Sequence, residues 1–325
     1  MVDLKAIAKK VRKALKDDEA IIDLESFDQD IPVFPTGCMS VDLASGVMGI
    51  PQGIVVEVFS PEGLGKTTFV LTMIAAFQRK YKEEGVAAFI DAEQAMDMPY
   101  AEELGVDFKN LLFSQPDSLE QATAIVQGIM KAKDDDTPCL IAVDSMASLA
   151  PEAEIEGGME KNSVALQARL FSKFFRITKV KRHSTTLICI NQLREKVGMV
   201  WGNPNMTPGG RALKFYSSMR IELSSKGKIK DGNAVIGHKV KARFVKNKKA
   251  PPYQEAIFQI IFGEGIDKDD DLVGCGIDYG TIEQSGKSYE FKDVKASGRA
   301  KFVKKLKKEK MMKKLRKAIR KAYYE

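Results

Sequence analysis

The sequence lacks the long apolar runs from which membrane-spanning helices are built. Among its 325 residues, no stretch approaches the roughly 18 uncharged apolar residues that a membrane span needs. The first 20 residues also lack the apolar region of a secretory signal. We therefore expect a soluble cytoplasmic protein without a membrane partner.

Cysteine is scarce, and no two cysteines share a CxxC spacing. The four are scattered along the chain, and two of them fall inside apolar, strand-like runs: Cys38, Cys139, Cys189 and Cys275. This distribution is typical of reduced thiols in a protein core and argues against a zinc or disulfide framework.

The charge is unevenly distributed. The net charge is +7, but residues 286–325 hold 16 Lys or Arg against 4 Asp or Glu, whereas the remainder holds 35 and 40. A basic terminus on a slightly acidic body favours contact with a polyanion, either nucleic acid or an anionic membrane surface. A helix that merely exposes its lysines to water is the alternative. Apolar residues recur there at helical spacing and favour a small folded domain over disorder: Met311, Leu315, Ile319 and Ala322.

From residue 54 to residue 262, β-rich runs alternate with helical patterns, which predicts an α/β fold with a mainly parallel sheet and hairpins at the end of the series. The runs are IVVEVF (54–59), VAAFI (86–90), CLIAV (139–143), TLICI (186–190), MRIEL (219–223), KVKARFV (239–245) and AIFQIIF (256–262). A helix is predicted after the first strand, with Gly85 as its stop, and another after Ser118, which pairs with Gln121 in a capping-box pattern. Residues 5–16 predict an amphipathic helix that packs on its own core or on a neighbouring subunit.

A phosphate-binding loop is predicted between the first strand and its helix. The segment SPEGLGKTT comprises Ser60, Pro61, Glu62, Gly63, Leu64, Gly65, Lys66, Thr67 and Thr68. It is close to the P-loop pattern, in which backbone N–H groups cradle the phosphates, the lysine neutralises the β and γ oxygens, and the threonine holds Mg²⁺. Ser60 departs from the pattern, because a glycine is expected there. A glycine turn with an incidental lysine is the alternative.

Further polar residues follow other strand runs, where open α/β sheets bind their ligands. Asp144 ends LIAVD and is the expected second Mg²⁺ residue. Glu93 is a candidate general base that orients the attacking water, and Gln192 is a neutral group able to sense the γ-phosphate. Tyr100 could stack on an adenine or belong to the core.

Two loops on this side of the predicted sheet combine apolar and basic residues. The first, between Gln192 and Leu213, holds four glycines and the single tryptophan, a composition suited to phosphates and stacked bases. Its candidate residues are Arg194, Lys196, Val197, Met199, Val200, Trp201 and Arg211. The second, at 151–163, precedes a helix that carries Arg169, Lys173 and Arg176. A lid over the nucleotide is the alternative for both.

These residues occur in several long, ordered segments by which the chain resembles the bacterial RecA recombinases over nearly its full length. The segments include TGCMSVDLASG (36–46), DAEQAMDMPYAEELGVD (91–107), LIAVDSMASLAPEAEIEG (140–157), NQLREKVGMVWGNP (191–204) and TPGGRALKFYSSMRIEL (207–223). The likeness is weakest before residue 31 and after residue 285. It implies a RecA-like P-loop ATPase core with a mainly parallel central sheet, a short N-terminal helical segment and a small basic C-terminal α+β domain. The expected domains are 1–32, 33–265 and 266–325.

The resemblance also implies roles for individual residues. Glu93 would be the catalytic glutamate, Gln192 would couple the γ-phosphate to DNA loops at about 157–164 and 194–210, and Asp97 with Tyr100 would contact the adenine. The residues expected at the DNA are Arg169, Arg176, Arg194, Gly209 and Gly210 at its backbone, with Val164 and Val197 between base triplets. Lys246 and Lys248 of VKNKK would reach the neighbouring subunit's γ-phosphate, with Lys214 and Phe215 at the same interface.

The implied function is ATP- and Mg²⁺-dependent polymerisation on single-stranded DNA, pairing with homologous double-stranded DNA, and strand exchange in recombination, repair and the SOS response. The implied partners are further copies of the chain, a single-strand-binding protein, loading mediators and a self-cleaving repressor. A hexameric helicase of the same fold and a nucleotide-gated scaffold with weak ATPase activity are the alternatives. Both a bacterial and a phage-encoded member fit, and the basic end in place of an acidic tail predicts weaker self-inhibition towards duplex DNA.

Overall fold

The computed structural model describes residues 3–16, 20–21, 31–157, 164–180, 184–195, 205–206 and 212–325. It comprises two compact units, Met1–Pro32 and Val33–Glu325. In the first unit, the predicted amphipathic helix is α1 (Leu4–Leu15). Asp3 caps it by accepting a hydrogen bond from Ala6 N at 3.0 Å, and Lys16 ends it in a left-handed conformation with φ of 51°.

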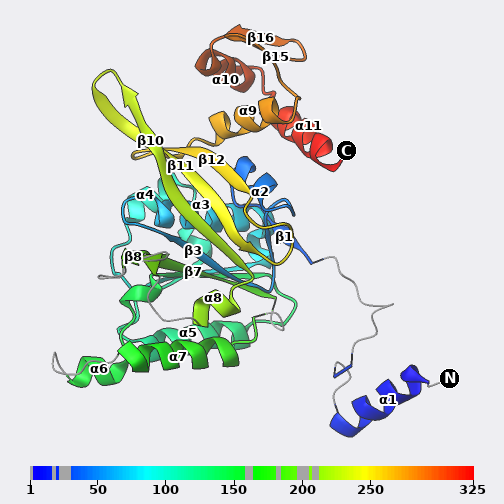
Figure 1. Cartoon of the computed structure of the whole chain (residues 1–325), viewed down its shortest axis with the longest axis vertical. Helices are drawn as coiled ribbons and strands as arrows, with labels where there is room; N and C mark the ends of the chain where they lie inside the picture. The colour runs from blue at the N-terminus through cyan, green and yellow to red at the C-terminus, as the bar shows by residue number, and fades with distance from the viewer. Residues whose placement is uncertain are drawn as a thin grey trace. The chain divides into compact units, whose positions relative to one another are not determined.

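A nine-stranded sheet forms the centre of the second unit (Figure 1). In spatial order the strands are β13 (Gly265–Ile266), β12 (Glu255–Ile261), β11 (Ala234–Asn247), β10 (Met219–Asp231), β3 (Val55–Ser60), β7 (Thr185–Gln192), β6 (Cys139–Asp144), β4 (Val86–Asp91) and β5 (Leu111–Ser114). Strands β10 to β5 run parallel, whereas β11, β12 and β13 add antiparallel pairs. The predicted parallel sheet with terminal hairpins is therefore confirmed. Strand β5 was missed because it is short and leaves Leu112 and Phe113 exposed.

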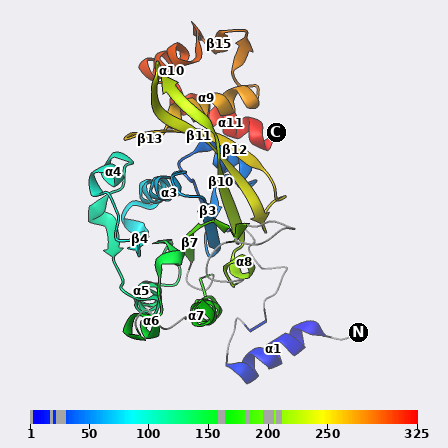
Figure 2. The same ribbon diagram turned by 60° about the vertical axis from the view of Figure 1, so that its left-hand side comes forward.

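Helices cover both faces of the parallel strands (Figures 1 and 2). Alternate strand residues point to opposite faces: Val56 and Val58 pack with α2 (Met39–Ala44), α3 (Lys66–Tyr81) and α4 (Met98–Glu103) in one core. Val55 joins the other core, with α5 (Leu119–Ala132), α7 (Val164–Ile177) and α8 (Ala212–Tyr216). Because both faces are covered, the central strands β3, β7, β6 and β4 carry buried apolar residues on both faces, whereas the more peripheral β10 alternates buried and half-buried residues.

Helix ends follow local chemistry, with one correction to the sequence analysis. Ser118 caps α5 as predicted, accepting a hydrogen bond from Gln121 N at 3.0 Å. The stop predicted at Gly85 is wrong: α3 ends at Tyr81, since Lys82 adopts φ of 50° and a 3₁₀ turn, η1 (Lys82–Glu84), follows. Gly85 itself is extended, with φ of −121°.

The basic C-terminal region is an α+β arrangement, which confirms the predicted fold class. Its elements are α9 (Lys268–Asp278), β14 (Glu283–Ser285), β15 (Ser288–Phe291), β16 (Val294–Ser297), α10 (Arg299–Lys308) and α11 (Met312–Tyr324). Leu315 and Ile319 of α11 are buried, as their spacing predicts, and they share a third core with Met39 and Leu43 of α2. The domain boundary between residues 265 and 266 stays a prediction.

Short elements complete the described chain. They are β1 (Val33–Phe34) paired with β2 (Ile50–Pro51), β8 (Arg194–Glu195) paired with β9 (Asn205–Met206), α6 (Glu152–Gly157), η2 (Phe108–Asn110) and η3 (Met146–Ser148). The four cysteines are free and buried, as predicted. Within the described ranges, no helix has both the length and the apolarity that crossing a membrane requires.

Candidate functional site

Four neighbouring strands, β3, β7, β6 and β4, end at one edge of the sheet. The parallel register pairs Ser60 with Gln192 and Asp91 with Asp144. Beyond the strands, Glu93 N donates a hydrogen bond to Asp144 O at 3.1 Å. The structure therefore brings the predicted residues Ser60, Glu93, Asp144 and Gln192 together, because the sheet order places their strands side by side.

The loop between β3 and α3 has the backbone geometry of an anion cradle. Its positive φ values fall on Gly63 (71°) and Gly65 (77°) among the described residues. Gly65 precedes the first turn of α3, and a Cβ atom there would lie 2.4 Å from Ile260 Cδ1. Pro61, Glu62 and Gly63 are exposed, Leu64 is half-buried and Thr68 is buried. Free N–H groups at the start of a 16-residue helix then face an accessible loop, which suits phosphate binding.

Lys66 lies within this loop and interacts with its backbone. Its Nζ donates to Pro61 O at 3.0 Å and lies 3.3 Å from Ser60 Oγ. The Ser60 hydroxyl donates in turn to Pro61 O at 2.6 Å, and Ser60 is fully buried. Burial lowers the pKa of Lys66, while the carboxylates of Asp144, Glu93 and Glu62 act in the opposite direction. The residue that departs from the P-loop pattern thus contacts the lysine directly.

Thr67 and Asp144 form the next part of the site. Thr67 Oγ1 donates to Asp144 Oδ2 at 2.5 Å. Burial raises the pKa of Asp144 to about 6; the Thr67 hydrogen bond opposes this, and the nearby Glu93 and Asp91 add to it. A hydroxyl and a carboxylate oxygen are ligands that Mg²⁺ accepts, and Mg²⁺ in phosphate sites uses one or two protein ligands. Among the residues that the structure describes, no group of three or more His, Cys, Asp or Glu is placed to hold a metal.

Glu93 and Gln192 are joined directly. Gln192 Nε2 donates to Glu93 Oε1 at 3.0 Å, and Glu93 is exposed. The loop that carries Glu93 is held by Asp91, whose Oδ2 accepts from Met96 N at 3.1 Å and from Gln115 Nε2 at 3.0 Å. The sequence analysis missed Asp91, although an aspartate that ends an apolar strand, as in LIAVD, is a usable signal.

A cavity of about 680 Å³ opens beside the loop. Its wall includes Gly63, Gly65, Thr68, Asp97, Tyr100, His238, Ile260 and Phe262. Tyr100 Oη lies 3.1 Å from Thr68 Oγ1, and Asp97 caps α4 by accepting from Tyr100 N at 3.0 Å. Tyr100 and Asp97 therefore line one cavity with the phosphate loop. The sequence analysis missed His238 and Phe262, which are distant in sequence and belong to no motif.

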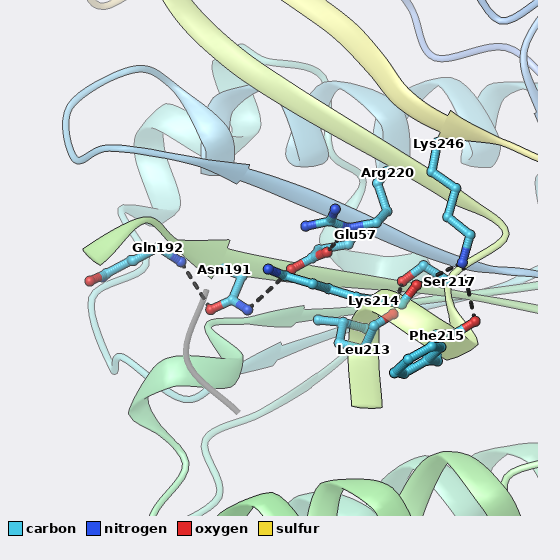
Figure 3. A network of polar contacts seen from close by, with 9 residues as sticks. All are labelled: Glu57, Asn191, Gln192, Leu213, Lys214, Phe215, Ser217, Arg220 and Lys246. Atoms are coloured by element: carbon cyan, nitrogen blue, oxygen red, sulfur yellow. Dashed lines mark hydrogen bonds and ion pairs between the residues drawn. The ribbon is translucent and has the colours of Figure 1, made fainter. Parts of the chain in front are cut away.

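Figure 3 shows a polar network behind Gln192, which the sequence analysis also missed. Gln192 N donates to Asn191 Oδ1 at 3.0 Å, and Asn191 Nδ2 donates to Glu57 Oε1 at 3.3 Å. Glu57 is fully buried and forms an ion pair with Arg220. Arg220 also lies 4.6 Å from the centre of the Phe59 ring. The sequence analysis did not predict a buried carboxylate in β3, because its cation, Arg220 of β10, lies 163 positions away in the sequence.

Lys246 and Lys248 lie elsewhere. Lys246 Nζ donates to Lys214 O at 2.6 Å and to Phe215 O at 3.1 Å (Figure 3). In register, Lys246 pairs with Arg220, which pairs with Glu57, three positions before Ser60. Lys248 is exposed, and the Phe215 side chain is 69% exposed. Within one chain, these lysines are therefore placed towards the start of β3, away from the phosphate loop at its end.

The predicted nucleic-acid residues are described in part. Arg169 and Arg176 are exposed on α7 with Lys173, and a spacing of three or four residues puts the three on one helix face. Val164 starts α7 and Arg194 starts β8. Two segments that were predicted as loops contain secondary structure. Strand β8 pairs with β9 between Gln192 and Leu213, and helix α6 lies within 151–163. Outside the described residues lie Lys196, Val197, Met199, Val200, Trp201, Gly209, Gly210 and Arg211.

Comparison with known proteins gives one family. The family model described as the RecA N-terminal domain matches residues 3–267. Protein RecA of Thermus aquaticus is 51% identical over 264 residues, which cover 80% of this chain and 76% of the relative. Protein RecA of Rubrobacter xylanophilus is 48% identical over 260 residues (79% and 74%), and that of Thermus thermophilus is 47% identical over 296 residues (90% and 84%). The chain therefore belongs to the RecA family of ATP-dependent DNA recombinases.

Proposed function

We propose that this chain binds ATP with Mg²⁺ at the carboxyl edge of β3, β7, β6 and β4. It hydrolyses ATP to ADP and phosphate while it assembles on single-stranded DNA, pairs it with homologous double-stranded DNA and exchanges strands. The observation that carries this proposal is the convergence of two contacts at one edge: Thr67 Oγ1 to Asp144 Oδ2 at 2.5 Å and Gln192 Nε2 to Glu93 Oε1 at 3.0 Å. Metal ligation and water activation would then take place side by side.

Phosphate binding would use the loop and its lysine. Backbone N–H groups of residues 60–68 surround the phosphates, and Lys66 exchanges its contact with Pro61 O for the β and γ oxygens. Thr67 and Asp144 would hold Mg²⁺, which supplies charge neutralisation at those oxygens. Since Thr67 already donates to Asp144, the two oxygens need little rearrangement. The adenine would occupy the cavity that Tyr100 and Asp97 line.

Glu93 is the proposed general base. Its exposed carboxylate accepts a proton from the attacking water, and the amide of Gln192 holds one of its oxygens in place. A γ-phosphate would offer Gln192 a second acceptor. An exchange of partner at Gln192 would move the start of the segment that continues into β8 at Arg194, which gives a physical route from nucleotide to DNA.

A neighbouring copy would complete the site. Because one chain keeps Lys246 and Lys248 away from its own phosphate loop, the two cations are free to serve the next subunit's γ-phosphate. The exposed Phe215, beside Lys214, supplies apolar area for that contact. A head-to-tail contact of this kind generates a helical filament when it does not close into a ring.

DNA would be bound by the basic face of α7 with Arg169 and Arg176, together with Val164, Arg194 and residues 196–211. Exposed arginines at helical spacing suit backbone phosphates. A single-strand-binding protein, loading mediators and a self-cleaving repressor are the further proposed partners, in the cytoplasm.

ATP hydrolysis measured with and without single-stranded DNA, at fixed salt and Mg²⁺, tests the proposal. We expect strong stimulation by DNA in the unaltered chain. Glu93→Gln should lower turnover by about 10²- to 10⁴-fold while ATP-dependent assembly on DNA persists. Glu83→Gln, an exposed carboxylate in η1, is the matched control and should leave turnover unchanged. Tight DNA binding with negligible turnover in the unaltered chain would instead favour the scaffold, and no DNA binding would contradict both.

A further inference from the structure

Asn247 is a buried polar residue between the two lysines that the proposed function assigns to the neighbouring subunit. It ends β11, with Lys246 before it and Lys248 after it. Asn247 is only 9% exposed, whereas Lys246 is half-buried and Lys248 is exposed. Successive side chains of a strand leave it on opposite faces, so Asn247 points away from the face that carries Lys246. This placement suits a residue that fixes the backbone of the lysines rather than one that contacts an anion beside them.

The side-chain amide of Asn247 makes three hydrogen bonds, all to backbone atoms. Its Oδ1 accepts from Lys249 N at 2.9 Å and from Ala250 N at 3.2 Å, which closes the turn after β11 in the way that asparagine side chains close turns. Its Nδ2 donates to Ser45 O at 2.8 Å. Ser45 is the C-cap of α2. The amide therefore joins the end of β11 to the end of a helix that lies 202 positions earlier in the chain.

The turn that follows Asn247 is held by two further contacts. Lys248 N donates to Ser218 O at 3.0 Å, which ties the turn to the residue before β10. Gly46 follows the α2 cap with φ of 74°, and a Cβ atom there would lie 2.3 Å from Ala250 Cβ. The backbone of the turn thus packs directly against the end of α2. Because a lysine side chain is long and flexible, the place that its ammonium reaches depends on such a fixed backbone.

We propose that Asn247 is a positioning residue, which holds the backbone from which Lys246 and Lys248 reach the neighbouring subunit's γ-phosphate. This inference rests on the proposed function, since it requires the two lysines to act on a neighbour. An amide supplies the acceptor and the donor together, whereas an ionised aspartate would offer Ser45 O no hydrogen. Cations assist phosphoryl transfer when they are held where charge develops, and a displacement of about 1 Å can cost about 10²-fold in rate.

The test measures ATP hydrolysis with single-stranded DNA for Asn247→Ala, alone and in equal mixtures with two other variants. Alone, its turnover should fall by about 10- to 100-fold. Mixed with Lys66→Ala, roughly a quarter of the head-to-tail interfaces combine an intact phosphate loop with correctly placed lysines, so turnover should recover. Mixed with Lys246→Ala, no interface has correctly placed lysines, so turnover should stay low. Damage to the fold as a whole would not produce this pattern.

Two further variants complete the experiment. Asn233→Ala makes the same substitution in the exposed turn between β10 and β11 and should leave turnover unchanged. Asn247→Ser keeps an oxygen that can accept from Lys249 N but is too short to bridge to Ser45 O, so its turnover should lie between those of Asn247→Ala and the unaltered chain. Thermal unfolding shows which variants are folded, and if Asn247→Ala is not, the same mixtures are made with Asn247→Ser.

The possible outcomes separate the inference from the proposed function. Turnover of Asn247→Ala within twofold of the unaltered chain would overturn the inference. Recovery with Lys246→Ala would place the effect in the phosphate loop of the same chain, and recovery with neither partner would indicate general damage; each would also overturn it. If Lys246→Ala itself hydrolyses ATP as fast as the unaltered chain, the proposed site between subunits is contradicted, and the inference with it.

Discussion

Lys66 and Lys246 lie in two regions of the molecule and make the same kind of contact. Lys66 Nζ donates to Pro61 O at 3.0 Å, and Lys246 Nζ donates to Lys214 O at 2.6 Å. Burial lowers the pKa of both lysines. Each ammonium thus interacts with backbone carbonyl oxygens, which are weak partners that an incoming phosphate could replace.

The charges around the two lysines differ. The charged groups that act on Lys66 are carboxylates: Asp144, Glu93 and Glu62. Those that act on Lys246 are chiefly cations, Lys248 and Arg220, and the carboxylate among its neighbours, Glu57, is already paired with Arg220. The phosphate loop is therefore balanced by its own chain, whereas the region around Lys246 carries positive charge that an external anion would neutralise. This difference is what a site shared between two subunits requires.

The largest effect on ATP hydrolysis should come from substituting each of the two lysines in a separate chain and then mixing the two variants. Lys66→Ala and Lys246→Ala should each lower DNA-stimulated ATP hydrolysis by about a hundredfold or more, because each removes a cation at the transferring phosphate. When the two variants are mixed in equal amounts, roughly a quarter of the interfaces in a head-to-tail assembly combine an intact loop with an intact Lys246. ATPase measurements on the mixture should show that recovery.

A mixture of Lys66→Ala with Glu93→Gln is the matched control for this recovery. Both residues belong to the same chain's loop edge, so no interface regains a complete site, and the mixture should stay inactive. Recovery in the control, or no recovery when Lys66→Ala is mixed with Lys246→Ala, would contradict the assignment of Lys246 to the neighbour's site.

Arg220, one of the cations around Lys246, forms a buried ion pair with Glu57. Arg220→Ala leaves a fully buried carboxylate without its cation, which should lower the free energy of unfolding by about 3–5 kcal/mol. A double variant, Glu57→Leu with Arg220→Met, should recover most of this loss, since two apolar side chains can replace a buried pair. Denaturant unfolding measures both. A loss below about 1 kcal/mol in the single variant would mean that water reaches Glu57.

The carboxylates around Lys66 should make the stability of the protein depend on pH. Burial raises the pKa of Asp144 to about 6, above its ordinary value of 3.8. The folded chain therefore holds this proton more tightly than the unfolded chain, and stability falls as pH rises from about 4 to 6. Asp144→Asn removes this loss and should stabilise the nucleotide-free protein at pH 7.5 by about 2–3 kcal/mol, with the gain vanishing near pH 4. Unfolding curves at both pH values test this, with Glu83→Gln as the control; equal gains at the two pH values would be inconsistent with it.

The smallest effect concerns Ser60, which contacts Lys66 in this chain. Ser60→Gly removes a hydroxyl that competes with phosphate for the ammonium, so ATP should bind about two- to tenfold more tightly. Ser60→Ala should match it, because the positive φ values in the described loop fall on Gly63 and Gly65, and nothing there requires glycine at position 60. Weaker ATP binding in both variants would show that the hydroxyl contacts the nucleotide instead.

Local sequence patterns predicted much of the fold and part of the site. Apolar strand runs followed by helical patterns predicted the order of elements, since hydrophobic periodicity is a short-range property. The phosphate loop was found because its glycines, lysine and threonine are consecutive. Asp144 and Gln192 followed from the rule that ligands bind at the carboxyl ends of parallel strands.

The residues that the sequence analysis missed are joined by distant contacts. Glu57 is paired with a residue 163 positions away, and Asp91 anchors its loop through Gln115, 24 positions away. No motif marks His238, which becomes part of the nucleotide cavity only when β11 pairs with β12. Asp91 could have been found, because it ends an apolar run as Asp144 does. The others cannot be predicted from spacing, because their partners are set by strand order and register.

The sequence by itself determined the chemistry that this chain carries: a phosphate loop, carboxylates after apolar strands, and basic residues concentrated near one end. Tertiary structure alone decided which of these groups meet. It placed Glu93 beside Gln192, Ser60 against Lys66, and Lys246 away from the loop of its own chain. The physical reason is range: propensity and periodicity act over a few residues, whereas burial and pairing across a sheet join side chains as distant in sequence as Glu93 and Gln192, 99 positions apart.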